Sequence, residues 1–463
     1  MSGALATARS ALAARRAWLV GGAVRDALLG RETTDLDLVV DGDVAAAARS
    51  LASAAGGTAF PLSSEFGHWR VVAPRQAWQA DLVPLAGGSI EADLRRRDFT
   101  ANAIAEPLGT GELVDPTGGR ADLEARRLRM VAPEAFDADP LRVLRLSRIA
   151  AELGLDPEPA TVAAAHARAP GLGATAGERV FAELRRLLVS ERPLEGMALM
   201  EATGATEVVL PELAALHGVG QSDYHHLDVH DHTLAVLAQV VALELDPAPL
   251  GPHAAPAAAL LSQPLADGLT RWGAMRLGAI FHDAAKPQTR TTFDGGRVGF
   301  PGHDERGAEM ARAALERLRA SERLRAHVAG LARHHLRVGF LIRRAPLGRR
   351  EVYGYLRATE PVEVDVTVLS VADRLATRGR KSEQAIERHL ALAGELLGEA
   401  LEWPAHSARA PLVRGDELAE ALGIEPGPRV GELLAGVQEA RFAGEVATRE
   451  QAIDWARRRA AGS

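Results

Sequence analysis

A glycine-rich turn near the start of the chain carries the residue types that bind phosphate groups. Residues 19–26 read Leu-Val-Gly-Gly-Ala-Val-Arg-Asp. Gly21 and Gly22 would let backbone N–H groups approach an anion, because glycine has no Cβ to keep a ligand away. The helix expected from Val24 to Leu29 would direct its positive end to the same place. We expect this turn, together with Arg25, to hold a triphosphate.

Two aspartates follow this turn on one expected strand. Asp35 and Asp37 are separated by one apolar residue, so both carboxylates emerge on the same face of the strand. Such a pair could hold two divalent cations for in-line phosphoryl transfer. Alone, a Gly-Gly turn or an Asp-x-Asp pair is more often a tight turn or a solvated strand edge. Their order and closeness favour a site for nucleotidyl transfer.

A second charged motif runs from Asp93 to Ile104 and places three arginines before an aspartate. It reads Asp-Leu-Arg-Arg-Arg-Asp-Phe-Thr-Ala-Asn-Ala-Ile. The small and apolar residues at its end predict a buried helix. Charged residues at the start of a buried helix indicate that a ligand binds there. Arg97 would contact phosphate and Asp98 a ribose hydroxyl. The alternative is a solvated helix start, which is commoner for an isolated motif of this kind.

A third motif opens a helix with a basic stripe. Asp139 and Pro140 precede Arg142, Arg145 and Arg148, which recur every three residues and therefore face one way. An aspartate and an arginine one turn apart can offer acceptors and donors to the edges of a base. An N-cap followed by a solvated basic face explains the same pattern equally well.

The composition bounds the fold and the compartment. The chain has 463 residues, 4% of them aromatic, and no cysteine. We therefore expect roughly three mainly helical domains, without disulfides or cysteine-ligated zinc. No segment offers about 18 uncharged apolar residues, which predicts a soluble, cytoplasmic protein that does not contact a membrane. The net charge of −7 argues against a general polyanion binder, yet local arginine clusters predict that one face binds nucleic acid. No feature of the sequence indicates a protein partner.

The pattern of strands and helices changes after Val131. Before it, strands are expected at Ala17–Val20, Leu36–Val40, Trp69–Val72, Ala80–Pro84 and Leu113–Asp115, after an Ala-rich helix over Met1 to Arg16. Beyond it the pattern is helical. The stretch Asp246 to Ala266, rich in Pro, Ala and Gly, predicts a disordered or surface insertion between two helices.

The middle of the chain holds an ordered set of histidines and aspartates. Its members are His232, His282, Asp283, His303, His334, His335 and Asp373. Single helical histidines are mostly core or surface residues, but an ordered set of this size indicates a metal site. The arrangement resembles the HD phosphohydrolase domain, which implies that His232, His282, Asp283 and Asp373 hold one metal. His303 with His334 or His335 would complete a second. Neutral imidazoles and carboxylates suit Mn, Fe, Ni, Mg or Zn.

Six ordered motifs resemble the class II tRNA nucleotidyltransferases, the CCA-adding enzymes and their bacterial poly(A) polymerase relatives. They are Gly-Gly-x-Val-Arg-Asp, Asp-x-Asp, Arg-Arg-Asp-Phe-Thr-x-Asn-Ala, Asp-Pro-x-Gly-Gly, Asp-Pro-Leu-Arg-x-x-Arg and Glu-Arg-Val. The likeness runs from about residue 17 to 190 and resumes over 412–452. It implies an α+β nucleotidyltransferase domain with a small mixed sheet, followed by an all-α neck, an HD domain and C-terminal helices. We expect these domains at 1–130, 131–205, 206–400 and 401–463.

The resemblance also implies roles for single residues. Asp35 and Asp37 would carry magnesium ions, with Asp81 as a candidate third carboxylate. Gly21, Gly22 and Arg25 would hold the triphosphate, Arg97 and Asp98 the ribose, and Asp139 with Arg142 the base of CTP or ATP, with Arg145 on the same stripe. The 3′-hydroxyl of tRNA would attack the α-phosphate, with pyrophosphate leaving.

Two departures from the family pattern bear on the product. The base-reading motif of the family begins Glu-Asp, whereas Ala138 stands here. Only about fifteen residues separate Asp81 from Arg96, where CCA-adding members usually carry a longer loop. The resemblance as a whole implies a tRNA nucleotidyltransferase that adds C, A or both to the 3′ end from CTP and ATP. A short segment is typical of relatives that add CC only, so these two departures favour an enzyme that stops after C. The alternatives are complete CCA synthesis, a poly(A) polymerase-like enzyme, and a non-catalytic tRNA-binding protein.

Overall fold

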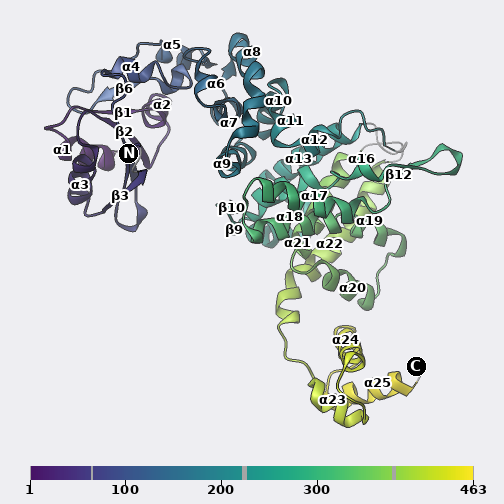
Figure 1. Ribbon diagram of the computed structural model, residues 1–463. Coiled ribbons are helices and arrows are strands. Elements are labelled where there is room, and N and C mark those ends of the chain that lie inside the picture. Colours follow the sequence, from purple (N-terminus) through teal and green to yellow (C-terminus); the bar gives the residue numbers. More distant parts are fainter. Residues whose placement is uncertain (1, 64–65, 222–226, 378–381, 462–463) are drawn as a thin grey trace. The chain divides into compact units, whose positions relative to one another are not determined.

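The computed structural model describes residues 2–63, 66–221, 227–377 and 382–461. The chain divides into two compact units, Met1–Val209 (unit 1) and Leu210–Ser463 (unit 2), and each is described by itself (Figure 1). The domain boundaries expected at 130, 205 and 400 stay predictions. Of the Ala-rich helix expected over 1–16, residues Ser2–Ala11 are helical, and Met1 lies outside the described residues.

Unit 1 contains a six-stranded sheet in the order β3-β4-β5-β2-β1-β6. The strands are β1 Ala17–Val20, β2 Asp35–Val40, β3 Thr58–Ser63, β4 His68–Val72, β5 Gln79–Pro84 and β6 Ala105–Pro107. β2 and β5 pair in parallel, and the other neighbours are antiparallel. The predicted small mixed sheet is therefore confirmed.

Four of the five predicted strands are present, and three of them begin one residue earlier than expected. The prediction of a strand at Leu113–Asp115 is wrong, because only Val114 pairs there, in an isolated bridge to Ala105. β3 escaped prediction because it is largely exposed and contains Pro61, which suits the edge of a sheet.

Helices surround this sheet and continue beyond it. They are α1 Ser2–Ala11, α2 Gly22–Leu28, α3 Val44–Ala55, α4 Ile90–Leu94, α5 Gly119–Glu124, α6 Ala135–Ala138, α7 Leu141–Leu153, α8 Pro159–Arg168, α9 Gly177–Leu188, α10 Pro193–Ala202 and α11 Ala205–Val209. Short 3-10 turns lie at Pro74–Gln76, Thr100–Asn102 and Ala169–Ala174, and β7 Arg127–Leu128 pairs with β8 Asp156–Pro157. α7 packs on α9 and α10, which fixes its basic stripe.

The buried helix predicted after the three arginines is wrong. Residues Thr100–Asn102 form a single 3-10 turn. The Asp98 carboxylate accepts hydrogen bonds from the Phe99 backbone N–H (2.8 Å) and the Asn102 side chain (3.0 Å). Such local side-chain bonds compete with a helix, so the segment is buried as a turn.

Unit 2 is almost entirely helical. Its helices are α12 Pro211–Ala214, α13 Val229–Leu245, α14 Ala254–Leu261, α15 Arg271–Phe281, α16 Lys286–Thr289, α17 His303–Arg317, α18 Glu322–His334, α19 Arg337–Leu341, α20 Arg349–Thr359, α21 Glu363–Ala376, α22 Ser382–Ser407, α23 Gly415–Leu422, α24 Pro428–Phe442 and α25 Arg449–Ala461. Short pieces are β9 Pro264–Ala266, β10 Leu269–Thr270, β11 Thr291–Thr292, β12 Val298–Gly299 and 3-10 turns at Ala248–His253, Asp294–Gly296 and Ile342–Arg344. α15 is buried from Trp272 to Phe281 and packs against α13, α18 and α21.

The stretch 246–266 is ordered, so the disordered alternative is wrong, whereas most of its residues are exposed or half-buried, as the surface alternative predicts. It forms a 3-10 turn, α14 and β9, and it buries Leu250, Ala257 and Leu261. These apolar side chains stabilise the segment despite its Pro and Gly content. Within the described residues no single helix is both long and apolar enough to cross a membrane. Only Val229–Leu245 and Ala248–Leu261 taken together meet that test, with a bend of 64° between them.

Candidate functional site

Unit 1 contains a cavity of about 550 Å³, here called the head cavity. It brings together most of the residues expected to bind nucleotide or metal. They are Gly21, Gly22, Arg25, Asp35, Asp37, Asp81, Arg97, Asp98, Arg142 and Arg145. Further lining residues include Arg70, Gln79, Asn102, Arg148 and Glu183, to which the sequence analysis gave no role. Asp139 does not line this cavity.

The acidic side of the head cavity lies on two parallel strands. Asp35 and Asp37 are exposed on β2 and alternate with the buried Leu36 and Leu38. Asp37 stands opposite Asp81 of β5 in the strand register. Loss of water around the carboxylate and the negative charge of Asp81 raise the pKa of Asp37. Crowded carboxylate oxygens of this kind fit a divalent cation, which would relieve their repulsion.

Arg70 holds the third carboxylate in place. Its Nε and Nη2 donate to the two oxygens of Asp81, each at 2.7 Å, from the neighbouring strand β4. A bidentate pair of this kind fixes the carboxylate plane. Arg70 lies inside the strand expected at Trp69–Val72, but nothing in that pattern marks its partner.

The glycine turn leaves room for a ligand beside these carboxylates. Gly21 has a φ of 65°, which favours glycine. A Cβ at this position would lie 3.2 Å from Arg97 Nη1 and 3.3 Å from Asp37 Oδ2. A side chain there would therefore be strained and would intrude between the acidic and the basic groups. The turn keeps open the space in which a phosphate could lie.

A hydrogen-bonded chain links the turn to helix α7. Arg25 Nη1 donates to Asn102 Oδ1 at 2.6 Å, Asn102 donates to Asp98, and Asp98 accepts from Arg145 Nη1 at 3.0 Å. Burial opposes ionisation of Asp98, but the charge of Arg145 and these hydrogen bonds outweigh it and lower its pKa. Asp98 therefore stays ionised and rigid at the centre of the cavity.

Of the two residues expected to contact the base, Arg142 lines the head cavity and Asp139 does not. Arg142 donates to the backbone carbonyls of Ala135 and Arg96, and its Nε is buried without a hydrogen-bond partner among the described residues. Asp139 instead accepts from Arg179 Nη2 at 2.7 Å and from the backbone of Leu141. Arg142 thus keeps one guanidinium donor unpaired among the described residues, at an atom that is buried from solvent.

Glu183 of α9 joins the arginines of α7. Its carboxylate accepts from Arg145 Nε at 3.3 Å and from Arg148 Nε. Arg148 and Glu183 are both buried, so at this end of the stripe the alternative of a solvated basic face is wrong, and the arginines form a packed ion network. The sequence showed Glu183 only as one residue of an amphipathic helix.

Replacing Glu183 by alanine should destabilise unit 1. Removing one partner of a buried ion network costs about 3 kcal/mol or more, because the remaining charges stay buried. We expect the unfolding transition of unit 1 to shift to a lower temperature, measured by calorimetry. Glu178→Ala, at an exposed position of the same helix, is the control. Equal melting temperatures for the two variants would contradict the role of Glu183.

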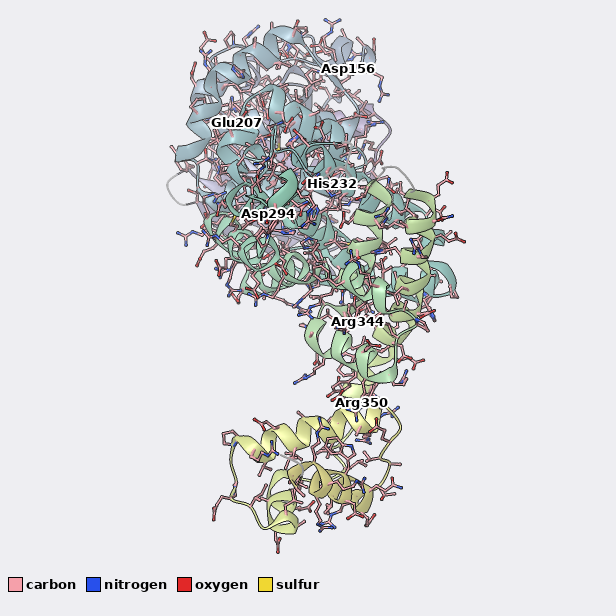
Figure 2. The ribbon with its side chains drawn as sticks, turned by 90° about the vertical axis from the view of Figure 1, so that its right-hand side faces the viewer. Asp156, Glu207, His232, Asp294, Arg344 and Arg350 are labelled. Carbon is pink, nitrogen blue, oxygen red and sulfur yellow. The ribbon has the colours of Figure 1, made fainter. Side chains whose placement is uncertain are left out.

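Unit 2 holds a second site, a cavity of about 220 Å³ here called the histidine cavity. His232, Asp283, His303, His335 and Asp373 line it, and His282 contacts Asp283 at 3.1 Å. Figure 2 shows His232 among the packed helices of this unit. His232 Nε2 lies 3.1 Å from Asp373 Oδ1, and His303 Nε2 lies 3.3 Å from Asp283 Oδ1. His232, His282 and Asp283 form one candidate metal group, and Asp283, His303 and His335 form another.

The histidine rings are oriented as metal ligands are. The Nδ1 atoms of His282, His303 and His335 donate to backbone carbonyls three residues earlier, at 2.8, 2.6 and 2.7 Å. This fixes the tautomer and leaves each Nε2 with a lone pair. All three Nε2 atoms are buried without a hydrogen-bond donor among the described residues. The donor set therefore fits divalent metal.

For His335 and Asp283 the electrostatics also fit a metal, whereas at His282 burial is outweighed by the charge of Asp283, which raises the pKa, so that a metal would have to displace a proton there. Burial and the neighbouring His282 lower the pKa of His335 to about 4. Burial opposes ionisation of Asp283, but His282 and Lys286 outweigh it and hold its pKa well below the usual value. A neutral imidazole beside an ionised carboxylate is the protonation state that a metal requires.

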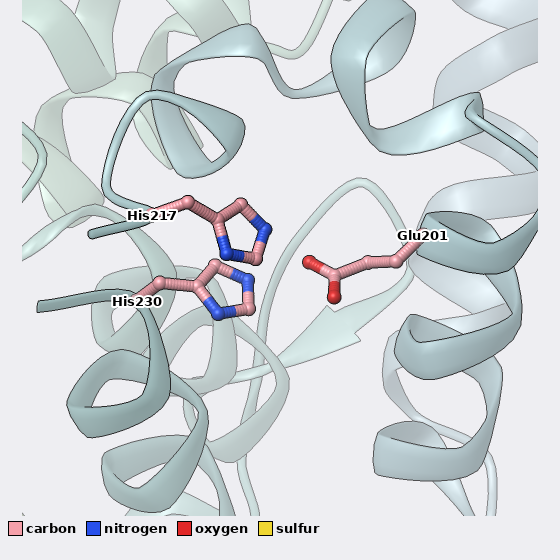
Figure 3. Close-up of side chains that lie close together, drawn as sticks. All are labelled: Glu201, His217 and His230. Atoms are coloured by element: carbon pink, nitrogen blue, oxygen red, sulfur yellow. The ribbon is translucent and has the colours of Figure 1, made fainter. Parts of the chain in front are cut away.

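His334 lies apart from the cluster. It does not line the histidine cavity, and its Nδ1 accepts from Arg337 Nε at 2.9 Å. Of the two adjacent histidines, the structure brings only His335 to the cavity. His230 also lies apart from His232, because residues two apart on a helix point to opposite sides. Its ring stacks on His217 with centroids 3.6 Å apart (Figure 3).

Lys286, Gln221 and Phe300 also line the histidine cavity. Lys286 Nζ lies 2.7 Å from Asp283 Oδ2 and donates to Gln221 Oε1 at 2.6 Å. Phe300 forms another part of the wall, 5.3 Å from the Lys286 ammonium. Gln221 and Phe300 lie outside helices, and no periodic pattern could have marked them.

Known protein families match the parts of the chain that contain the two cavities. The "Poly A polymerase head domain" family matches residues 17–77 and 63–129, and the "HD domain" family matches 229–378. The family described as "Probable RNA and SrmB- binding site of polymerase A" matches 154–216. The head cavity lies mainly in the first match and the histidine cavity mainly in the second.

Relatives that match this chain over most of their length support the same family assignment. The chain is 39% identical to the A-adding tRNA nucleotidyltransferase of Deinococcus radiodurans, over 94% of this chain and 93% of the relative. It is 38% identical to the CC-adding tRNA nucleotidyltransferase of Thermus thermophilus, over 94% and 92%. In fold it resembles the Thermotoga maritima CCA-adding enzyme complexed with tRNA, with a TM-score of 0.63, 18% identity and coverage of 100% and 98%. The chain therefore belongs to the tRNA nucleotidyltransferase family, and its second unit carries an HD domain.

Proposed function

We propose that the head cavity adds nucleotides to the 3′ end of tRNA, with CTP and ATP as donors. One observation carries this proposal: a pair of carboxylates on β2 faces a glycine turn and a basic helix across one cavity. The relatives, which add A or CC to tRNA, support tRNA as the acceptor. Purified protein incubated with labelled nucleotide and truncated tRNA provides the test.

Each side of the head cavity has its part in the reaction. Asp35 and Asp37 would hold magnesium, which supplies charge stabilisation to the reacting phosphate. Arg25, Arg97 and the N–H groups of the glycine turn would bind the triphosphate. The 3′-hydroxyl of tRNA forms the new bond to the α-phosphate, and the bond to pyrophosphate breaks. Arg142, which lines the cavity, would contact the base.

The enzyme should stop after adding C. The segment after β5 is tied down by Ser89, which caps α4, and by Asp93, which accepts from the Ala86 backbone and from Arg97. The segment after β5 is thus held in place, and Ala138 supplies no hydrogen-bonding side chain to the base motif. The base site of the head cavity therefore cannot easily rearrange its hydrogen-bond donors and acceptors from those that suit cytosine to those that suit adenine. We expect CTP to extend tRNA that lacks its CCA end, and ATP alone to leave tRNA ending in CC unchanged. Efficient addition of a terminal A would restore a complete CCA-adding enzyme.

An A-adding enzyme is the second candidate. The 39% identity to an A-adding relative favours it. The same assay separates the two, because an A-adding enzyme would use only tRNA that ends in CC, and only with ATP. A poly(A) polymerase-like enzyme would instead give long products on other RNAs. A non-catalytic tRNA-binding protein would give no product.

We also propose that the histidine cavity is a metal-dependent phosphohydrolase centre. His232, His282, Asp283 and Asp373 would hold one divalent ion, and His303 with His335 would complete a second, which together supply Lewis-acid stabilisation of a phosphate. Lys286 would contact that phosphate, and Gln221 would position Lys286. Hydrolysis of 2′,3′-cyclic phosphates or phosphate monoesters at tRNA ends is the expected activity.

A further inference from the structure

Unit 2 contains another cavity, of about 550 Å³, which belongs to neither site described above. It lies between α17, α18 and the segment that precedes α21, and is here called the α18 cavity. Helix α18 lines it with Arg323, Ala326, His327, Ala329, Gly330, Arg333 and His334. Most of these residues are three or four positions apart and therefore share one face of the helix. The volume lies within the range of pockets that bind small organic ligands, about 300–1,000 Å³.

The floor of the α18 cavity is apolar. Gly330 and the buried Val362 form it, with Val362 within 3.2 Å of a Cβ built at Gly330, and the exposed Ala326 also lines the cavity. The imidazole of His327 is the buried polar group there, and its Nε2 lies 3.1 Å from Asp365 Oδ1. An uncharged floor of this kind suits a ring system rather than a small inorganic ion.

The rim of the cavity has an excess of positive charge. Arg271 is paired with Asp365, Arg312 with Glu322, Glu309 with Arg306 and Glu360 with Arg357. Arg323 and Arg333 are both exposed, and neither has an ion pair in the part of the chain that the structure describes. Ten residues of helix separate their Cα atoms by about 15 Å, which leaves room for a ring between the guanidinium groups.

We propose that the α18 cavity binds a nucleoside phosphate. A phosphate group would pair with Arg323 or Arg333, since guanidinium binds phosphate with two parallel hydrogen bonds. The base and ribose would cover the floor, and the second guanidinium would stack on the base. Inorganic phosphate or pyrophosphate would leave the floor uncovered, so these ions should bind more weakly.

The α18 cavity shares two helices with the histidine cavity. α18 carries His327 and ends just before His335, and α21 carries Asp365 and Asp373, so each pair is eight residues apart, about 12 Å. The hydrogen bond between His327 and Asp365 joins the two helices beneath the α18 cavity. A nucleotide bound in the α18 cavity would therefore affect the geometry of the histidine cluster through these two helices. This consequence rests on the proposed phosphohydrolase function, whereas the binding itself does not.

Photolabelling of the full-length protein with 8-azido-ADP, followed by peptide mapping, tests the proposal. We expect label on peptides from residues 303–334 in addition to the head, and protection of those peptides by ADP but not by equal pyrophosphate. The double variant Arg323→Glu/Arg333→Glu should reduce the labelling of these peptides at least tenfold. Ala326→Trp, which fills part of the cavity without a charge change, should do the same.

A matched control distinguishes an effect at the α18 cavity from an effect of the overall charge of the protein. Arg319→Glu with Arg343→Glu changes the charge equally at exposed positions that do not line the cavity, and should leave the label in place. Nucleotide addition by all variants reports that unit 1 is intact. The proposal is overturned if label is confined to residues 17–190, if pyrophosphate protects as well as ADP, or if the Arg323 and Arg333 variant keeps its label. Loss of tRNA binding with unchanged labelling would assign the arginines to RNA instead.

Discussion

The double variant Asp35→Ala/Asp37→Ala should lose nucleotide addition by about a thousandfold or more. Metal ions contribute several kcal/mol of transition-state stabilisation, and about 4 kcal/mol corresponds to that factor. Binding of tRNA should change by only a few-fold, because the metal charge acts on the reacting phosphate more than on docking. Incorporation of labelled CTP into truncated tRNA, together with a filter-binding titration of tRNA, measures both quantities.

Asp41→Ala is the matched control for this pair. Asp41 directly follows β2 and pairs with Arg16, and it does not line the head cavity. We expect this variant to keep nearly full activity. Rapid nucleotide addition by the double variant would show that the carboxylates of β2 are not the centre of the reaction.

Removing a ligand of the histidine cavity should abolish hydrolysis without affecting nucleotide addition. His335→Ala, His282→Ala or Asp283→Ala should each lose metal-dependent hydrolysis of 2′,3′-cyclic AMP, because the metal can no longer be held. The head cavity lies within unit 1, so incorporation of CTP into tRNA should stay within twofold. Both assays are run on the same preparations.

The neighbouring histidine provides the sharpest control. His334→Ala changes the same residue type one position earlier, at a side chain that contacts Arg337 and not the cluster. Because His334 also lines the α18 cavity, the assay contains no nucleoside phosphate besides the substrate, and under that condition the variant should hydrolyse the cyclic phosphate at the wild-type rate. If His334→Ala and His335→Ala are equally inactive, or if nucleotide addition falls with hydrolysis in a folded protein, the two sites are not separate as proposed.

The features that depend on local pattern could be predicted from the sequence. Alternation of Asp35 and Asp37 with buried leucines placed both carboxylates on one face, because a strand repeats every two residues. The glycine turn could be located because the conformation at Gly21 favours glycine. The second site could also be predicted, because histidine and aspartate are recognisable in the sequence as metal ligands and occur there in an ordered set.

The features that depend on partners distant in the chain could not be predicted. Asp139 was expected to face the base, but Arg179 of another helix holds it. Glu183 and Arg70 shape the head cavity through contacts with residues 35 and 11 positions away, which no local period encodes. The ordered stretch 246–266 shows the same limit, because its burial against other helices outweighs a composition typical of loops.

The central claim is that the head cavity transfers nucleotides to tRNA, and one assay tests it directly. Purified wild-type protein is given labelled CTP or ATP with three tRNAs, which lack the CCA end, the final CA or the final A. We expect magnesium-dependent incorporation of CTP into the two tRNAs that lack a C, and no such incorporation by Asp35→Ala/Asp37→Ala. Incorporation of neither nucleotide into any of the three tRNAs would contradict this claim.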